Sequence, residues 1–210
     1  PLPAWATAPA PAEETPSKPL APSRAALIEP AALSPLKDNG KQRYQRGIII
    51  HRLLQSLPDM PPPRRHAAAT AFVQRAAWGL TPEEGEAIVA ETLAVLNTPA
   101  FAALFAPGSK AEVPLTGLVG KHAVSGQVDR LAVTETDVWI IDYKTNRPPP
   151  REAAKVDPAY IFQMATYRAA LRTIYPRHIV RCVLLWTDGP FTMELDPARM
   201  DGVLRDTGLV

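Results

Sequence analysis

Two acidic residues and a lysine are spaced so that they could form a metal-dependent catalytic site. Asp129 closes the segment Gly126-Gln127-Val128-Asp129, and Asp142-Tyr143-Lys144 follows thirteen residues later. Carboxylates hold hard divalent cations such as Mg²⁺ or Mn²⁺, which remove the repulsion between two close acids. Such a cation polarises a phosphodiester and lowers the pKa of a bound water, while an ammonium group offsets the developing charge. The pattern therefore favours hydrolysis of phosphodiesters.

The simpler alternative is a structural salt bridge between Asp142 and Lys144. With about 25% of residues charged in an average chain, an acid two residues before a lysine recurs by chance roughly once per couple of hundred residues. Most such pairs on protein surfaces contribute little. The acid at Asp129 and the apolar run before Asp142 favour the metal site over this alternative.

Alternating apolar residues predict that two short antiparallel strands carry these acids. The apolar positions are Val128, Leu131 and Val133 in the first strand, and Val138, Ile140 and Ile141 in the second. A turn centred on Glu135 and Thr136 sets Asp129 opposite Asp142, with their Cβ atoms about 5 Å apart. Lys144 then shares a face with Asp142, Ile140 and Val138, so the site borders a buried surface.

A helix is predicted over Asp157 to Tyr175, beginning at Asp157-Pro158 and stopped by Pro176. Gln163 and Tyr167 are four residues apart and share one face of it. A solvated glutamine and a core tyrosine are the ordinary alternative for such a pair.

Together, Gly-x-x-Asp, Asp-Tyr-Lys-Thr and Gln-x-x-x-Tyr resemble the RecB-like nuclease branch of the PD-(D/E)XK superfamily. The resemblance implies an α+β fold with a central, mostly antiparallel or mixed sheet flanked by helices. It implies that Asp129, Asp142 and the Tyr143 carbonyl bind Mg²⁺, for which Mn²⁺ substitutes, and that Lys144 is the catalytic lysine. Gln163 and Tyr167 would contact the DNA backbone or support the site.

The same family places a histidine ligand on an upstream helix. The segment from Tyr44 to Leu57 matches its Gly-x-x-x-His-x-x-Leu pattern through Gly47 and His51. A lone histidine among isoleucines is by default a core residue, and the resemblance instead favours His51 as a metal ligand. Glu112 is a further candidate near the site, with an exposed strand edge as the alternative.

The domain organisation follows from composition. Residues 1–40 are rich in proline and alanine and predict an extended linker, on which Trp5 or Leu27-Ile28 could dock. Residues 41–210 are expected to form the nuclease domain. It would contain two inserted helices, Ala67 to Trp78 and one from Thr81 to Asn97, and then a strand near 179–187 with a hairpin to Met193. The chain starts at Pro1 rather than methionine, so we expect a larger protein upstream.

The linker and the nuclease motifs together resemble the C-terminal part of AddA-type helicase–nuclease subunits. That resemblance implies an AddB-type partner, single-stranded DNA ends as substrate, and a cytoplasmic, nucleoid-associated role in double-strand-break repair by recombination. The single cysteine, Cys182, excludes a four-cysteine iron–sulfur cluster within this chain. No apolar run reaches the length of a membrane span. A free-standing phage-type exonuclease and a non-catalytic DNA-binding or scaffold module remain as alternatives.

Overall fold

The computed structural model describes residues 19–22 and 39–210, whose framework is one five-stranded sheet. The strands lie in sequence order: β1 (Lys110–Val119), β2 (His122–Val133), β3 (Asp137–Lys144), β4 (Ile179–Trp186) and β5 (Phe191–Glu194). The first three are antiparallel, β4 runs parallel to β3, and β5 is antiparallel to β4. The expected α+β architecture with a mixed sheet is confirmed.

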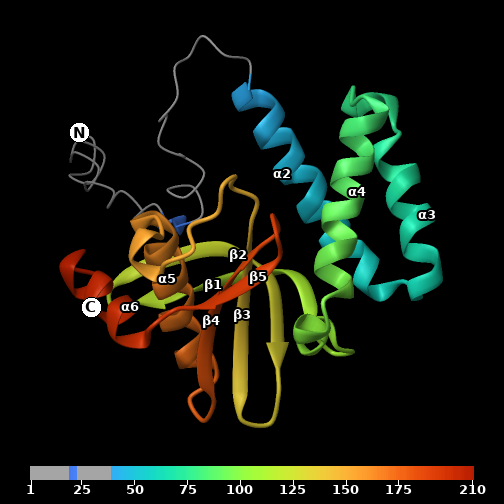
Figure 1. Ribbon diagram of the computed structural model, residues 1–210. Helices are drawn as coiled ribbons and strands as arrows, with labels where there is room; N and C mark the ends of the chain where they lie inside the picture. Colours follow the sequence, from blue (N-terminus) through green and yellow to red (C-terminus); the bar gives the residue numbers. More distant parts are fainter. Residues whose placement is uncertain (1–18, 23–38) are drawn as a thin grey trace, which may run out of the picture.

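Helices cover both faces of the sheet (Figure 1). One face carries α2 (Asn39–Ser56), α3 (Pro62–Val73) and α4 (Pro82–Asn97), and the other carries α5 (Pro158–Ile174) and α6 (Pro197–Asp206). Short 3₁₀ segments complete the described chain at η2 (Leu57–Asp59), η3 (Ala76–Trp78), η4 (Pro99–Phe105) and η5 (Ala153–Lys155).

Each face of the sheet has its own hydrophobic core, and β3 contributes to both. Val138 and Ile140 pack in the core with α5, whereas Ile141 and Tyr143 pack in the core with α2 and α4. Side chains of a strand alternate between faces, so a strand between two helical layers reads as a nearly continuous apolar run. Burial on both faces explains the apolar run Val138-Trp139-Ile140-Ile141. Packing of β3 on both faces also fixes the positions of Asp142 and Lys144, which follow at its end.

The predicted hairpin register is correct as far as the backbone pairing extends. The pairs run from Val133 with Val138 to Arg130 with Ile141, so Asp129 lies one residue beyond the last pair. Val128 and Leu131 pack in the same core although strict alternation would separate them. The alternation is therefore interrupted at Asp129 and Arg130, where β2 leaves β3.

The helix predictions hold with two corrections. The helix expected from Tyr44 to Leu57 runs over Asn39–Ser56, so it begins earlier, within the last residues of the expected linker. Helix α5 has the expected limits, and the Asp157 carboxylate accepts a hydrogen bond from the Ala159 N–H. Helix α4 begins with the expected capping box between Thr81 and Glu84. The preceding helix runs over Pro62–Val73 rather than from Ala67 to Trp78. Prolines in a first helical turn lack only N–H groups that would have no partner in the helix, so the helix starts earlier than the alanine-rich run suggests.

Within the proline-rich segment, the structure describes only a short contact with the domain. Leu20 pairs with Val124 of β2, and its N–H donates to the Ala123 carbonyl at 2.7 Å. Trp5 and the Leu27-Ile28 pair lie outside the described residues. In the described part of the chain no single helix is long and apolar enough to cross a membrane; α4 and η4 together reach that length and composition, with a bend of 85° between them.

Candidate active site

The residues expected to perform chemistry line one open cavity of about 660 Å³. It lies beside α2, and its other walls come from the middle of β2, the C-terminal end of β3 and the first turns of α5. The lining consists of acids, an amide-rich rim and several cations, contributed by Arg43, Tyr44, Gly47, Ile48, His51, Arg52, Gln55, Glu112, Gln127, Asp129, Asp142, Tyr143, Lys144, Thr145, Asn146, Tyr160 and Gln163.

Three of these side chains form a compact group of potential metal ligands. One ligand atom from each of His51, Glu112 and Asp129 lies within 4.8 Å of the others. The His51 Nδ1 atom is 3.5 Å from Asp129 Oδ1. Glu112 adopts a left-handed backbone conformation with φ of 53°, which is uncommon for a residue other than glycine. Two carboxylates suit Mg²⁺ or Mn²⁺ and the imidazole favours Mn²⁺, so this donor set fits a divalent cation.

The Asp129 side chain of β2 is held in place by the backbone of β3. Its Oδ2 accepts a hydrogen bond of 2.7 Å from the Tyr143 N–H, and so satisfies a donor beyond the end of the β2–β3 ladder. The next residue, Arg130, is only 1% exposed. Its guanidinium donates to the Tyr143 hydroxyl at 3.0 Å and to the Leu54 carbonyl at 3.2 Å. A buried guanidinium with several acceptors is rigid, so it fixes the backbone that carries Asp129.

Asp142 lies outside the three-ligand group and is engaged by Lys144 and Gln163. Its Oδ2 is 2.7 Å from the Lys144 ammonium, and its Oδ1 accepts from Gln163 Nε2 at 3.0 Å. Gln163 Oε1 accepts in turn from Lys144 at 3.4 Å. The ammonium is 3.6 Å from the ring centroid of Tyr160. Asp142 Oδ2 is buried, with the Lys144 ammonium as its polar contact among the described residues. A carboxylate oxygen has two lone pairs, so one is left for a further ligand.

The pKa values of the acids and of His51 in the site depend on burial and on one another's charges. Burial lowers the pKa of His51, but the neighbouring Asp129 carboxylate outweighs it and holds this pKa above its usual value. Burial raises the pKa of Asp142, with repulsion from Asp129 adding to it and Lys144 only partly offsetting it. Burial and the charge of Asp129 likewise raise the pKa of Glu112. Burial acts on Asp129 in the same direction, but His51, the Tyr143 N–H and Lys144 outweigh it and hold the pKa of Asp129 below its usual value. A cation bound here would favour the charged form of all three acids.

Tyr167 is placed beneath the site rather than in the cavity. Its ring is 1% exposed, and its hydroxyl accepts a hydrogen bond of 3.3 Å from the Gln127 N–H. A Cβ atom at Gly126 would lie 2.3 Å from the tyrosine oxygen, so only glycine leaves room for the ring. This placement fits support of the strand that carries Asp129, and not contact with DNA. Gln163 lines the cavity but is 5% exposed and holds Asp142 and Lys144.

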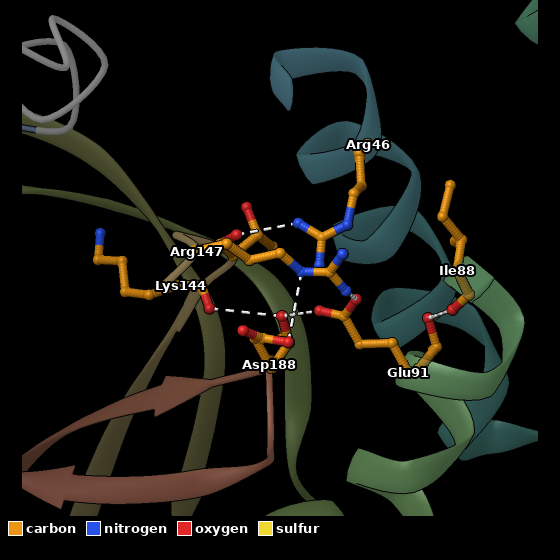
Figure 2. Close-up of polar contacts among 9 residues, drawn as sticks. Arg46, Ile88, Glu91, Lys144, Arg147 and Asp188 are labelled. Carbon is orange, nitrogen blue, oxygen red and sulfur yellow. Dashed lines mark hydrogen bonds and ion pairs between the residues drawn. The ribbon is translucent and has the colours of Figure 1, made fainter. Parts of the chain in front are cut away.

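A buried polar network behind the site joins four elements (Figure 2). The Glu91 carboxylate of α4 accepts from Arg46 of α2, from Thr187 after β4 and, at 2.5 Å, from Arg147. Arg46 also donates to the Thr145 carbonyl at 2.9 Å, and the Thr187 N–H donates to the Lys144 carbonyl at 3.0 Å. In Figure 2 the Lys144 side chain points away from Glu91 while its carbonyl faces the network.

Sequence reasoning missed Glu91 and Arg130. The sequence contains a signal for a buried Arg130, because a charged residue interrupts the apolar positions of β2 directly after Asp129. It contains no local signal for the role of Glu91, since the partners of Glu91 are 45 to 96 residues away along the chain.

Comparison with known proteins agrees with this geometry. The family model described as the PD-(D/E)XK nuclease superfamily matches residues 24–195. A solved structure of a "putative exonuclease" from Eubacterium rectale superposes with a TM-score of 0.52 at 9% identity, covering 82% of this chain and 65% of that one. The structure of SSO0001 gives a TM-score of 0.32 at 16% identity, covering 80% of this chain and 85% of that one. The chain thus spans 65% of the length of the exonuclease structure.

No curated protein gave a match to this chain. The family model covers well over half of the sequence. This chain belongs to the PD-(D/E)XK nuclease superfamily.

Proposed function

We propose that this domain hydrolyses phosphodiester bonds of single-stranded DNA with the help of Mg²⁺, which Mn²⁺ can replace. The observation that carries the proposal is the meeting of the His51, Glu112 and Asp129 group with the Asp142–Lys144 pair in one open cavity. Neither set alone would distinguish a nuclease from a structural ion pair.

His51, Glu112, Asp129, Asp142 and the Tyr143 carbonyl are the groups that would hold the cation. When bound, the cation neutralises phosphate charge and makes a water more acidic. Glu112 is included in the ligand set because its carboxylate lies beside His51 and Asp129.

Lys144 provides a fixed positive charge at the cavity floor. Its ammonium is held by Asp142, Gln163 and the face of Tyr160. Preorganised charge stabilises a transition state better than mobile charge, because no reorganisation is needed when negative charge develops on the phosphate. The Asp142 carboxylate raises the pKa of Lys144 against the effect of burial, which keeps the ammonium protonated.

The wider role is that of the nuclease module of an AddA-type helicase–nuclease, with an AddB-type subunit as partner, in double-strand-break repair by recombination. The motif order and the proline- and alanine-rich segment before residue 41 support this role. ATP-dependent unwinding of duplex DNA by the complete gene product, together with an AddB-type subunit, tests it. Absence of unwinding would restrict the proposal to a nuclease without a motor.

The nuclease activity itself is tested with end-labelled single-stranded DNA. We expect cleavage with Mg²⁺ or Mn²⁺, none in EDTA, and a loss of about a hundredfold to a thousandfold in rate for Asp142→Asn, the range seen when one preorganised group is removed. Asp206→Asn, an exposed acid on α6, is the matched control and should cleave normally. Normal cleavage by Asp142→Asn, or cleavage in EDTA, would refute the metal-dependent mechanism.

A further inference from the structure

The burial of Tyr167 and Gln163 raises the question of which residues contact the substrate strand. Contact with DNA requires exposed side chains that line the cavity. On α2 these include Arg43, Tyr44 and Arg52. Tyr44 is 61% exposed, and it is the one exposed aromatic residue among the cavity-lining residues that the structure describes.

The helical spacing places Tyr44 in line with the ligand group. Gly47, Ile48 and His51 follow it by three, four and seven residues, and all of them line the cavity. They therefore share one face of α2. At 1.5 Å per residue, Tyr44 lies about 10 Å along the helix axis from His51. This distance corresponds to about three nucleotides of a helical strand and to fewer in an extended one.

Charge is arranged along this face in the way that a polyanion requires. Arg43 and Arg52 are exposed on either side of the Tyr44 to His51 stretch, whereas the acids Glu112, Asp129 and Asp142 lie more deeply in the cavity. Phosphates that follow the arginines would bring one bond to the acids and their cation, and would bring a base within reach of the Tyr44 ring.

Resting on the proposed function, we propose that Tyr44 is a nucleobase-stacking subsite that makes the domain select single-stranded DNA. A tyrosine ring can stack on any base, because every base has a π face, and such stacking is tolerant of sequence. In a duplex the bases are paired and stacked on each other, so the ring gains nothing unless a base is unstacked. Arg43 and Arg52 neutralise phosphates on either side of the stacked base.

Binding of a labelled oligonucleotide in EDTA tests the subsite without cleavage. Relative to the unsubstituted protein, Tyr44→Leu should raise Kd for single-stranded DNA by about tenfold to a hundredfold. It should leave Kd for duplex DNA unchanged, and Tyr44→Phe should bind as the unsubstituted protein does. Leucine favours helix at least as well as tyrosine, so α2 is preserved. Removing single bases from the oligonucleotide should identify one position where Tyr44→Leu has no further effect.

The contribution of Arg43 to phosphate binding is tested by the salt dependence of Kd. Arg43→Gln should lower the slope of log Kd against log salt by about 0.7 for each single-strand phosphate that the arginine neutralises in the unsubstituted protein. Arg172→Gln, an exposed arginine of α5 outside the cavity, is the matched control and should leave the slope unchanged.

Equal weakening of single-stranded and duplex binding by Tyr44→Leu would overturn the subsite, as would the absence of a base position coupled to it. Loss of the nuclease function would look different. An unsubstituted protein that binds single strands through Tyr44 but does not cleave them with Mg²⁺ or Mn²⁺ would refute the proposed activity and leave the stacking subsite standing.

Discussion

At the scale of single residues, two motif glycines are required by close contacts with distant segments of the chain. Gly126 is required because the Tyr167 ring packs directly against its backbone. Gly47 lets α2 approach β3, since a Cβ atom there would lie 3.1 Å from the Thr145 hydroxyl. The sequence identifies Asp129, Asp142, Lys144 and His51 because their types suit the chemistry. It cannot identify why glycine precedes the acid and the histidine, because the atoms that demand glycine come from distant segments.

Gly126→Ala should therefore be costly despite its small size. The added methyl would overlap the Tyr167 ring, and overpacking of this kind costs about 1 to 3 kcal/mol of unfolding free energy. Urea denaturation measures this loss, and cleavage should fall as well because Asp129 is three residues away. Gly117→Ala on β1 is the matched control, as its Cβ would meet Ala170 at 3.6 Å, an ordinary contact. Equal stability of the two variants would show that Tyr167 can move away at little cost.

At the scale of elements, most of the fold could be predicted because it depends on local signals. Helix α5 follows from Asp157-Pro158 and Pro176, α4 from its capping box, and the β2–β3 hairpin from apolar alternation. The start of α3 was missed although Pro62 and Pro63 are a local signal for a first helical turn. The break in alternation at Asp129 had no local signal, because it depends on where β2 separates from β3.

The Glu91 network connects the helical layer to the end of β3. One carboxylate of α4 fixes Arg46 of α2 and Thr187 after β4, and these in turn hold the backbone at Thr145 and Lys144. The helical insert is thus connected to the end of the strand that carries the lysine. Donors from three segments, Arg46, Arg147 and Thr187, would lose their charged acceptor if the charge of Glu91 were removed.

Glu91→Gln should lower the unfolding free energy by about 1 to 3 kcal/mol, because the two arginines lose their charged acceptor. It should also reduce kcat more than it raises KM, since the network positions Lys144 and not the substrate. Denaturation and steady-state cleavage measure the two effects. Glu86→Gln, an exposed acid of the same helix, is the control. A kcat equal to that of the unsubstituted protein would limit Glu91 to a structural role.

At the scale of the whole molecule, the site lies between two separately packed halves. His51 comes from the helical layer with α3 and α4, Asp129 from the middle of β2, Asp142 from near the end of β3, and Gln163 from α5 on the opposite face. The sequence indicated that these residues belong together through their order, but the meeting of the two cores at one cavity is a consequence of sheet topology. A cation bound by residues from the helical layer and the sheet would tie those parts together.

Cation binding should therefore be visible as stability. At a cation concentration a hundred times Kd, binding adds about 2.7 kcal/mol, which for a domain of this size raises Tm by about 5 to 10 °C. We expect this rise with Mn²⁺ for the unsubstituted chain and a much smaller one for His51→Ala, because imidazole is a better ligand for Mn²⁺ than for Mg²⁺. Without metal, and at a pH above the raised pKa of His51, the two proteins should melt at similar temperatures, since the neutral imidazole has no ion pair with Asp129 to lose. His66→Ala, at an exposed position of α3, should retain the full rise. An equal Mn²⁺-induced rise in His51→Ala and the unsubstituted chain would remove His51 from the ligand set, and the cation would then rest on the carboxylates alone.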